Sequence, residues 1–69
     1  MIKYIVDENA LPSGAYQLHN ATRGCTGIPN LKNQIFIGNF ADCELALKRA
    51  RMNWPREKVI RCPKCCAEE

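Results

Sequence analysis

The chain has 69 residues, a formal net charge of +3 and five cysteines. A chain this short forms at most one domain, over residues 1–69, and its apolar core alone is marginal. Domains of this size often need a disulfide, a metal ion or a partner subunit. Because five is an odd number, the cysteine count excludes a framework in which every thiol is paired.

The beginning of the chain indicates the cellular compartment. Only three apolar residues separate Lys3 from the acidic pair at positions 7 and 8, whereas a secretory signal needs an uninterrupted apolar run. No apolar stretch approaches the length that spans a membrane. We therefore predict a cytoplasmic protein without membrane contact, in a compartment where clustered cysteines hold metal more often than they form disulfides.

Two short strands are predicted in the first third of the chain. Residues 2–6 combine β-branched and aromatic types, and residues 7–14 carry turn-forming residues. Residues 15–19 form the second predicted strand. Strict alternation places His19 on the face opposite Leu18, at a strand end that faces out of the main core.

A loop and a further strand follow. Residues 20–33 are rich in Asn, Thr, Gly and Pro and contain Cys25. A loop of this length is unusual in so small a chain unless something fixes it, and a metal bond through Cys25 would do so. Residues 34–40 contain three consecutive apolar side chains and give the clearest strand signal.

The last third predicts a helix and a final strand. Asp42 is a good N-cap for a helix over residues 43–53, and Pro55 prevents its continuation. One helix face is apolar, and residues 58–61 form a short strand that leads into the cysteine-rich end. Together these elements predict an α+β fold with a small antiparallel sheet of about three strands and one central helix, stabilised by zinc. The apolar helix face consists of Cys43, Ala46, Leu47, Ala50 and Trp54.

The strongest chemical signal is a predicted zinc site formed by His19, Cys25, Cys62 and Cys65. The two residues between Cys62 and Cys65 allow a tight turn that aims both sulfurs at one point, and Pro63 stiffens it. Three thiolates and one imidazole form a common structural zinc set, in which the second ring nitrogen of the histidine usually binds a further acceptor. Four protein ligands close the site and leave no position for a hydrolytic water.

Other roles for these residues remain open. His19 is alternatively an ordinary exposed histidine, and Cys25 a free loop thiol. Cys43 has the pattern of a small buried apolar residue, although its position at a helix N-terminus also permits a reactive thiol. Cys66 competes with Cys65 as a ligand, or pairs with Cys43 or Cys25 on oxidation.

Seven basic residues follow one another closely in the second half of the chain, with Glu57 as the acidic residue among them. Such a patch attracts phosphates, so nucleic acid or an acidic protein is a possible partner. The alternative is a solvated surface without a partner. The seven residues are Lys48, Arg49, Arg51, Arg56, Lys58, Arg61 and Lys64.

The order of these motifs resembles the small zinc-binding domain at the N-terminus of the Ada DNA-repair protein and Ada-like zinc modules of other bacterial proteins. It is also similar to small uncharacterised bacterial proteins with a cysteine early in the helix and a double cysteine near the end. The resemblance implies a zinc site. It does not imply methyl transfer, because His19 stands where the Ada domain has its first cysteine. The likeness covers residues 14–66 and rests on Tyr16, His19, Cys25, the 35–37 strand, Phe40, Asp42, Glu44, Ala46, Cys62 and Cys65.

The sequence therefore predicts a non-enzymatic structural zinc-binding module that binds nucleic acid or a protein partner. Two alternatives stay open: a thiol-active protein that uses the C-terminal cysteines for redox chemistry or group transfer, and a disulfide-linked domain without metal. The chain has no catalytic Ser/His/Asp pattern, no phosphate-binding Gly loop and no paired carboxylates at a useful spacing, so we do not expect hydrolytic catalysis.

Overall fold

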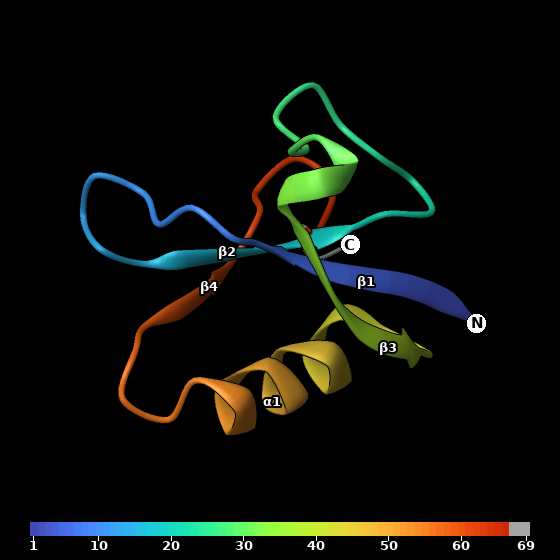
Figure 1. The fold of residues 1–69 in the computed structure, drawn as a ribbon. Helices are drawn as coiled ribbons and strands as arrows, with labels where there is room; N and C mark the ends of the chain where they lie inside the picture. The colour runs from blue at the N-terminus through green and yellow to red at the C-terminus, as the bar shows by residue number, and fades with distance from the viewer. Residues whose placement is uncertain (67–69) are drawn as a thin grey trace.

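The computed structural model describes residues 1–66, and these residues form a mixed β-sheet with a helix across one face (Figure 1). The predicted α+β class is confirmed, and the strands and the α-helix begin and end within one residue of the predicted positions, whereas the short 3-10 helix lies in the expected loop. Within residues 1–66 these elements are β1 (Ile2–Asp7), β2 (Tyr16–Asn20), the 3-10 helix η1 (Leu31–Asn33), β3 (Gln34–Phe40), α1 (Cys43–Asn53) and β4 (Val59–Arg61).

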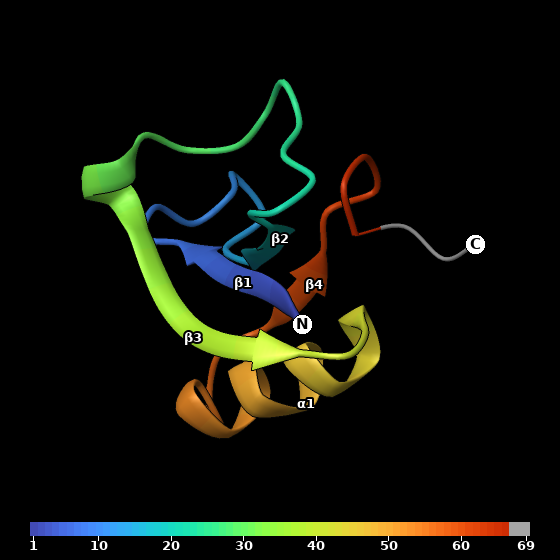
Figure 2. The ribbon, with the colours of Figure 1, turned by 90° about the vertical axis from the view of Figure 1, so that its right-hand side faces the viewer.

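The sheet has the strand order β3-β1-β2-β4. β1 pairs antiparallel with both β2 and β3, whereas β4 pairs parallel with β2. The sheet is therefore mixed and has a fourth strand, where the sequence led us to expect about three antiparallel ones. The physical reason is the crossover: α1 carries the chain from one sheet edge to the other, and a helical crossover returns the next strand in the same direction. In Figure 2, β3 curves along its edge and continues into α1.

The main core lies between the sheet and α1, which packs against all four strands. Ala46 and Ala50 are fully buried, and their small side chains let the helix approach the sheet closely. The predicted apolar helix face is thus the packed face. Facing these alanines, the sheet buries Tyr4, Val6, Leu18 and Val59.

His19 lies on the opposite face of the sheet from Leu18, as alternation predicts. It is not at an exposed corner, however, because its exposed fraction is 0%. It pairs with Ile5 of β1, which is also buried. The long 21–33 loop lies on this side of the sheet, away from α1 (Figure 1). The loop therefore covers a second, smaller buried layer that contains the histidine.

A disulfide between Cys43 and Cys66 joins the start of α1 to the C-terminal turn. The favoured interpretation of Cys43 as a buried free thiol is therefore wrong, and its pairing with Cys66, which the sequence left open, is found. The bond spans 23 residues, so in the chain-entropy view it stabilises the fold by about 3 kcal/mol. Asp42 caps the same helix end, since its Oδ1 accepts a 3.0 Å hydrogen bond from the Leu45 amide.

β3 contains a bulge at Ile37 and Gly38, where the register with β1 shifts between Tyr4 and Ile5. Gly38 has a φ of +140°, and an added Cβ would lie 3.1 Å from the Phe40 ring. We expect Gly38→Ala to lower the free energy of unfolding by about 1–3 kcal/mol, because the backbone and the ring both resist the side chain. Urea denaturation followed by Trp54 fluorescence measures this change.

Gly27→Ala is the matched control, because an added Cβ at Gly27 meets nothing within 4 Å. Equal stabilities for the two variants would show that the bulge does not require glycine.

Candidate metal centre

The parallel pairing of β2 and β4 brings two distant parts of the chain together. The register aligns Leu18 with Arg61, and the Cys62 amide extends the pairing by donating a 2.9 Å hydrogen bond to the Leu18 carbonyl. His19 at the end of β2 and Cys62 just after β4 therefore leave the same end of the sheet. An antiparallel β4 would have separated them by the length of the strand.

The 20–25 turn presents Cys25, and Asn20 organises it. The Asn20 side-chain Oδ1 accepts a 2.9 Å hydrogen bond from the Arg23 amide, and its carbonyl accepts a 2.8 Å bond from the Gly24 amide. Gly24 has a φ of +74°, in the left-handed region that favours glycine. The chain therefore reverses directly before Cys25 and directs it back toward β2.

The 62–66 turn supplies the other two thiols. The Cys66 amide donates a 3.0 Å hydrogen bond to the Cys62 carbonyl and closes the turn. The two turns also contact each other: the Asn20 amide donates to Cys65 Sγ at 3.3 Å, and Lys64 Nζ donates to Thr26 Oγ1 at 3.2 Å. Each half of the site therefore holds the other in place.

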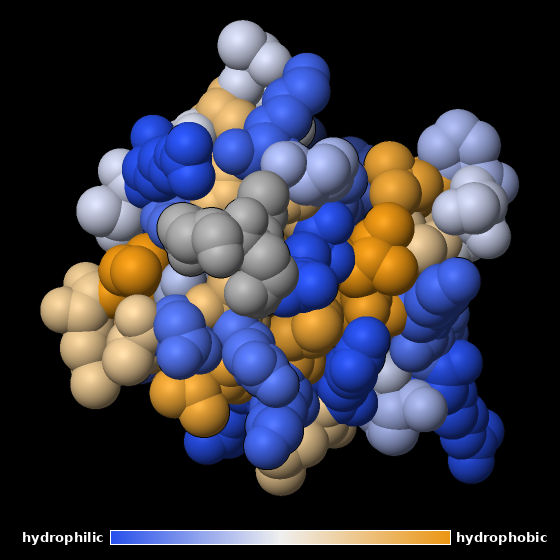
Figure 3. Space-filling view, turned by 180° about the vertical axis from the view of Figure 1, so that it is seen from behind, coloured by the Kyte–Doolittle hydropathy of each residue, from blue (hydrophilic) through white to orange (hydrophobic). Residues whose placement is uncertain are grey.

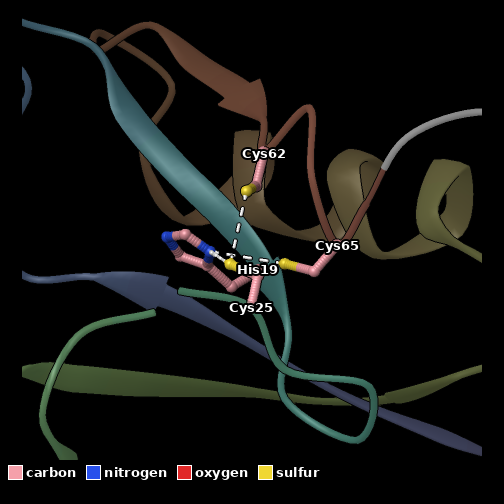
Figure 4. Close-up of side chains that lie close together, drawn as sticks. All are labelled: His19, Cys25, Cys62 and Cys65. Atoms are coloured by element: carbon pink, nitrogen blue, oxygen red, sulfur yellow. Dashed lines mark hydrogen bonds between the residues drawn. The ribbon is translucent and has the colours of Figure 1, made fainter. Parts of the chain in front are cut away.

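The four residues that the sequence selected converge on one point (Figure 4). Their ligand atoms all lie within 4.8 Å of one another, which positions the group to hold a metal ion. His19, Cys62 and Cys65 are buried, and Cys25 is half-buried. The contacts are Cys25 Sγ–Cys62 Sγ at 3.8 Å, His19 Nδ1–Cys25 Sγ at 3.8 Å and His19 Nδ1–Cys65 Sγ at 3.5 Å.

The orientation of His19 selects Nδ1 as the ligand atom, because Nδ1 faces the sulfurs. Among residues 1–66, the buried Nε2 has no hydrogen-bond partner, so the further acceptor expected for a metal-bound histidine is not found in this part of the chain. Burial lowers the pKa of His19, and the charge of Asp7 offsets part of this effect. The imidazole is therefore neutral at physiological pH, as a metal ligand must be.

Two of the thiols differ in acidity although they lie in one turn. Burial alone would raise the pKa of Cys62, but hydrogen bonds from the Cys65 and Lys64 amides and from two neighbouring thiols outweigh it and lower the pKa. Burial raises the pKa of Cys65 to about 12, despite the hydrogen bond from the Asn20 amide. Without a metal ion, Cys62 is thus the first of this pair to lose its proton.

The other sequence candidates lie outside this cluster. Cys66 is in the disulfide and does not replace Cys65 as a ligand. The basic residues spread over α1, the following turn, β4 and the 62–66 turn, but Lys48, Arg51 and Arg61 line a common hollow. Sequence reasoning missed Asn20, whose only signal was an Asx residue at the start of a Gly-containing loop.

Comparisons with protein families, curated proteins and solved structures find no match to this chain. In the part of the chain that the structure describes, no helix is long and apolar enough to cross a membrane.

Metal binding to this cluster should depend on pH, because a metal ion must displace the proton of Cys65 at neutral pH. With Co²⁺ as the probe, we expect affinity to rise with pH, by about tenfold per pH unit for each displaced proton. The sign follows from the raised pKa of Cys65: the bound form holds a thiolate, whereas the free form holds a thiol. Titration by visible absorbance at several pH values, beside a direct measurement of proton release, tests this expectation.

An affinity that stays constant between about pH 6 and about pH 8 would contradict thiolate ligation at this cluster.

Proposed function

We propose that this protein is a non-enzymatic structural zinc-binding module. The observation that carries the proposal is the spacing of the four ligand atoms. Zinc bonds of about 2.3 Å to sulfur and about 2.05 Å to nitrogen, at tetrahedral angles, require S···S separations of about 3.8 Å and N···S separations of about 3.6 Å. Three of the six ligand pairs have these separations: the Cys25–Cys62 sulfurs are 3.8 Å apart, and Nδ1 of His19 lies 3.5 and 3.8 Å from two sulfurs. All four ligand atoms lie within 4.8 Å of one another.

The donor set also favours zinc over other common cations. Thiolates are soft ligands, which select zinc, copper(I) or iron rather than magnesium or calcium, and three sulfurs with one imidazole suit a tetrahedral zinc ion. Four protein ligands fill that coordination, so the ion would serve the fold and not hydrolysis. His19, Cys25, Cys62 and Cys65 would hold it, and it would tie the 21–33 loop to the C-terminal turn.

A disulfide-linked domain without metal is less well supported. The Cys43–Cys66 bond exists, but it leaves Cys25, Cys62 and Cys65 free and grouped around a buried histidine. Two thiols that contact Nδ1, with a third beside Cys25, are explained by a shared ion and not by the disulfide. The proposed likeness to Ada-like zinc domains includes these four ligands. The proposed cytoplasmic location is compatible with the three free thiols, because reduced thiols are the rule in that compartment.

We further propose that the module binds nucleic acid through a basic hollow between α1 and β4. Lys48 and Arg51 lie one turn apart on α1, and Arg61 ends β4, so that the three line a hollow of about 420 Å³ with Leu47 and Glu44. Three cations against one carboxylate leave a net positive hollow, which favours the anionic phosphates of a nucleic-acid backbone. Seen from behind, the described residues present hydrophilic side chains with apolar ones between them (Figure 3).

The zinc proposal predicts one zinc ion per chain, measured by elemental and native mass spectrometry. Alanine variants of His19, Cys25, Cys62 and Cys65 should each lose the metal and much of their stability, because a structural zinc site contributes directly to folding. The double variant Cys43→Ser/Cys66→Ser is the matched control, since it removes two cysteines outside the cluster and should still hold one zinc ion when zinc is saturating.

A folded, metal-free protein with three free thiols, purified with zinc present throughout, would refute the zinc proposal.

The nucleic-acid proposal predicts salt-sensitive binding of labelled oligonucleotides, measured by fluorescence anisotropy at about 50 and about 200 mM salt. The charge-reversal variants Lys48→Glu and Arg51→Glu should each weaken binding by about tenfold and reduce the salt slope by about one, as the loss of a phosphate contact does. Lys32→Glu in η1 is the control, because Lys32 carries the same charge outside the hollow. Stronger competition by polyglutamate than by oligonucleotide would point to an acidic protein partner instead.

A further inference from the structure

A second hollow, of about 320 Å³, lies where the start of α1 meets the two cysteine turns. Cys43 and Cys66, which form the disulfide, and Cys65 are among its lining residues, so three of the five cysteines border one space. Its volume is at the lower end of the range for ligand pockets, about 300–1,000 Å³. Its charged lining consists of Arg23, Asp42 and Glu44.

We propose that this hollow is a thiol–disulfide exchange site whose co-substrate is a small zwitterionic thiol, such as glutathione or cysteine. A structural disulfide is usually enclosed by the core, but this one borders an open space. Cys43 is half-buried whereas Cys66 is only 2% exposed, so Cys43 Sγ is the more accessible sulfur. The hollow shares Cys65 with the metal cluster, but the disulfide residues Cys43 and Cys66 are not among its four ligands, so the exchange needs no metal ion.

The exchange balances with two molecules of the small thiol. The first attacks Cys43 Sγ as a thiolate, so that a mixed disulfide forms, the Cys43–Cys66 bond breaks and Cys66 leaves as a thiolate. The second attacks the sulfur of the bound small molecule and releases Cys43 as a thiolate, together with the oxidised small disulfide. Cys43 is the first residue of α1, where the helix dipole stabilises the negative charge that forms. The protein gains two electrons, and the two small thiols lose them.

The charges around the hollow match a zwitterion. Arg23 can attract the carboxylate and the thiolate of the incoming molecule, while Asp42 and Glu44 can attract its ammonium group. A thiol without carboxylate and ammonium groups gains only the attraction between Arg23 and its thiolate. The hollow should therefore distinguish thiols by charge as well as by size.

The exchange would also weaken metal binding at the cluster, and this part of the proposal rests on the proposed zinc function. Cys66 follows Cys65 directly, and the disulfide fixes the 62–66 turn to α1. Opening the bond frees that turn at one end, so Cys65 is held less firmly in its ligand position. In a cytoplasmic protein, persistent disulfides are rare, and those that occur are usually transient, catalytic or redox-sensing.

The experiment follows the reduction of the oxidised protein by glutathione and by 2-mercaptoethanol at matched thiolate concentrations. Samples are alkylated at intervals, and mass spectrometry then gives the fraction of Cys43 and Cys66 that is reduced at each time. We expect a reduction rate that is proportional to thiol concentration and independent of urea below the unfolding transition. The rate with glutathione should be about tenfold higher than with 2-mercaptoethanol, after each rate is divided by that of the same thiol with an unfolded control. Arg23→Glu should remove the advantage of glutathione, whereas Arg49→Glu, outside the hollow, should keep it.

Reduction that accelerates steeply with urea would overturn the proposal, because it would show that the disulfide opens only on unfolding. An unchanged preference for glutathione in Arg23→Glu would overturn the assignment of the hollow.

Zinc affinity is the second readout, measured by competition with a chelating dye for the oxidised, reduced and Cys43→Ser/Cys66→Ser forms. We expect the last two to bind zinc about tenfold more weakly than the oxidised form. Equal affinities would overturn the coupling between the two sites. Absence of zinc binding in every form would refute the zinc proposal, while the exchange kinetics would still decide the exchange site by themselves.

Discussion

The parallel pairing of β4 with β2 is the constraint on which the metal cluster depends. It is a short contact of three residue pairs, and the Cys62 amide extends it by one more hydrogen bond. Because both strands run the same way, the ends of β2 and β4 lie side by side, and each continues into a turn that carries thiols. A metal ion between the turns and the pairing of the strands would therefore stabilise each other, since losing either one separates His19 from Cys62.

The buried layer around His19 shows why so small a chain would need a metal ion between the two turns. The main core between α1 and the sheet is built largely from small side chains on the helix, Ala46 and Ala50. On the other face, a long loop without regular structure before η1 covers Ile5 and an imidazole whose Nε2 has no partner within residues 1–66. An unsatisfied buried nitrogen costs free energy, so this layer is not favourable through burial alone. Ligation at Nδ1 is the compensating interaction that the geometry permits.

Much of the fold was predictable because its signals are local. The Asp42 cap, the spacing of Ala46 and Ala50 and the stop at Pro55 define α1 from neighbouring residues alone. The direction of β4 was not predictable in this way, because it depends on how α1 crosses the sheet. The four members of the cluster could be selected from ligand chemistry and spacing, whereas the role of Asn20 could not. Its amide, carbonyl and side chain act on three different partners, and this depends on the tertiary fold.

The adjacency of Cys65 and Cys66 places two kinds of sulfur chemistry on one turn. Cys65 points into the cluster with His19, and Cys66 is bonded to Cys43. A thiolate that holds metal must stay reduced, whereas its neighbour in the sequence is oxidised. The two states can coexist only if the turn keeps their sulfurs directed apart, and the hydrogen bond from the Cys66 amide to the Cys62 carbonyl helps to fix that geometry. A change at the disulfide would therefore act first on the backbone that positions Cys65, so this turn is where the proposed redox change and the proposed metal binding would be coupled.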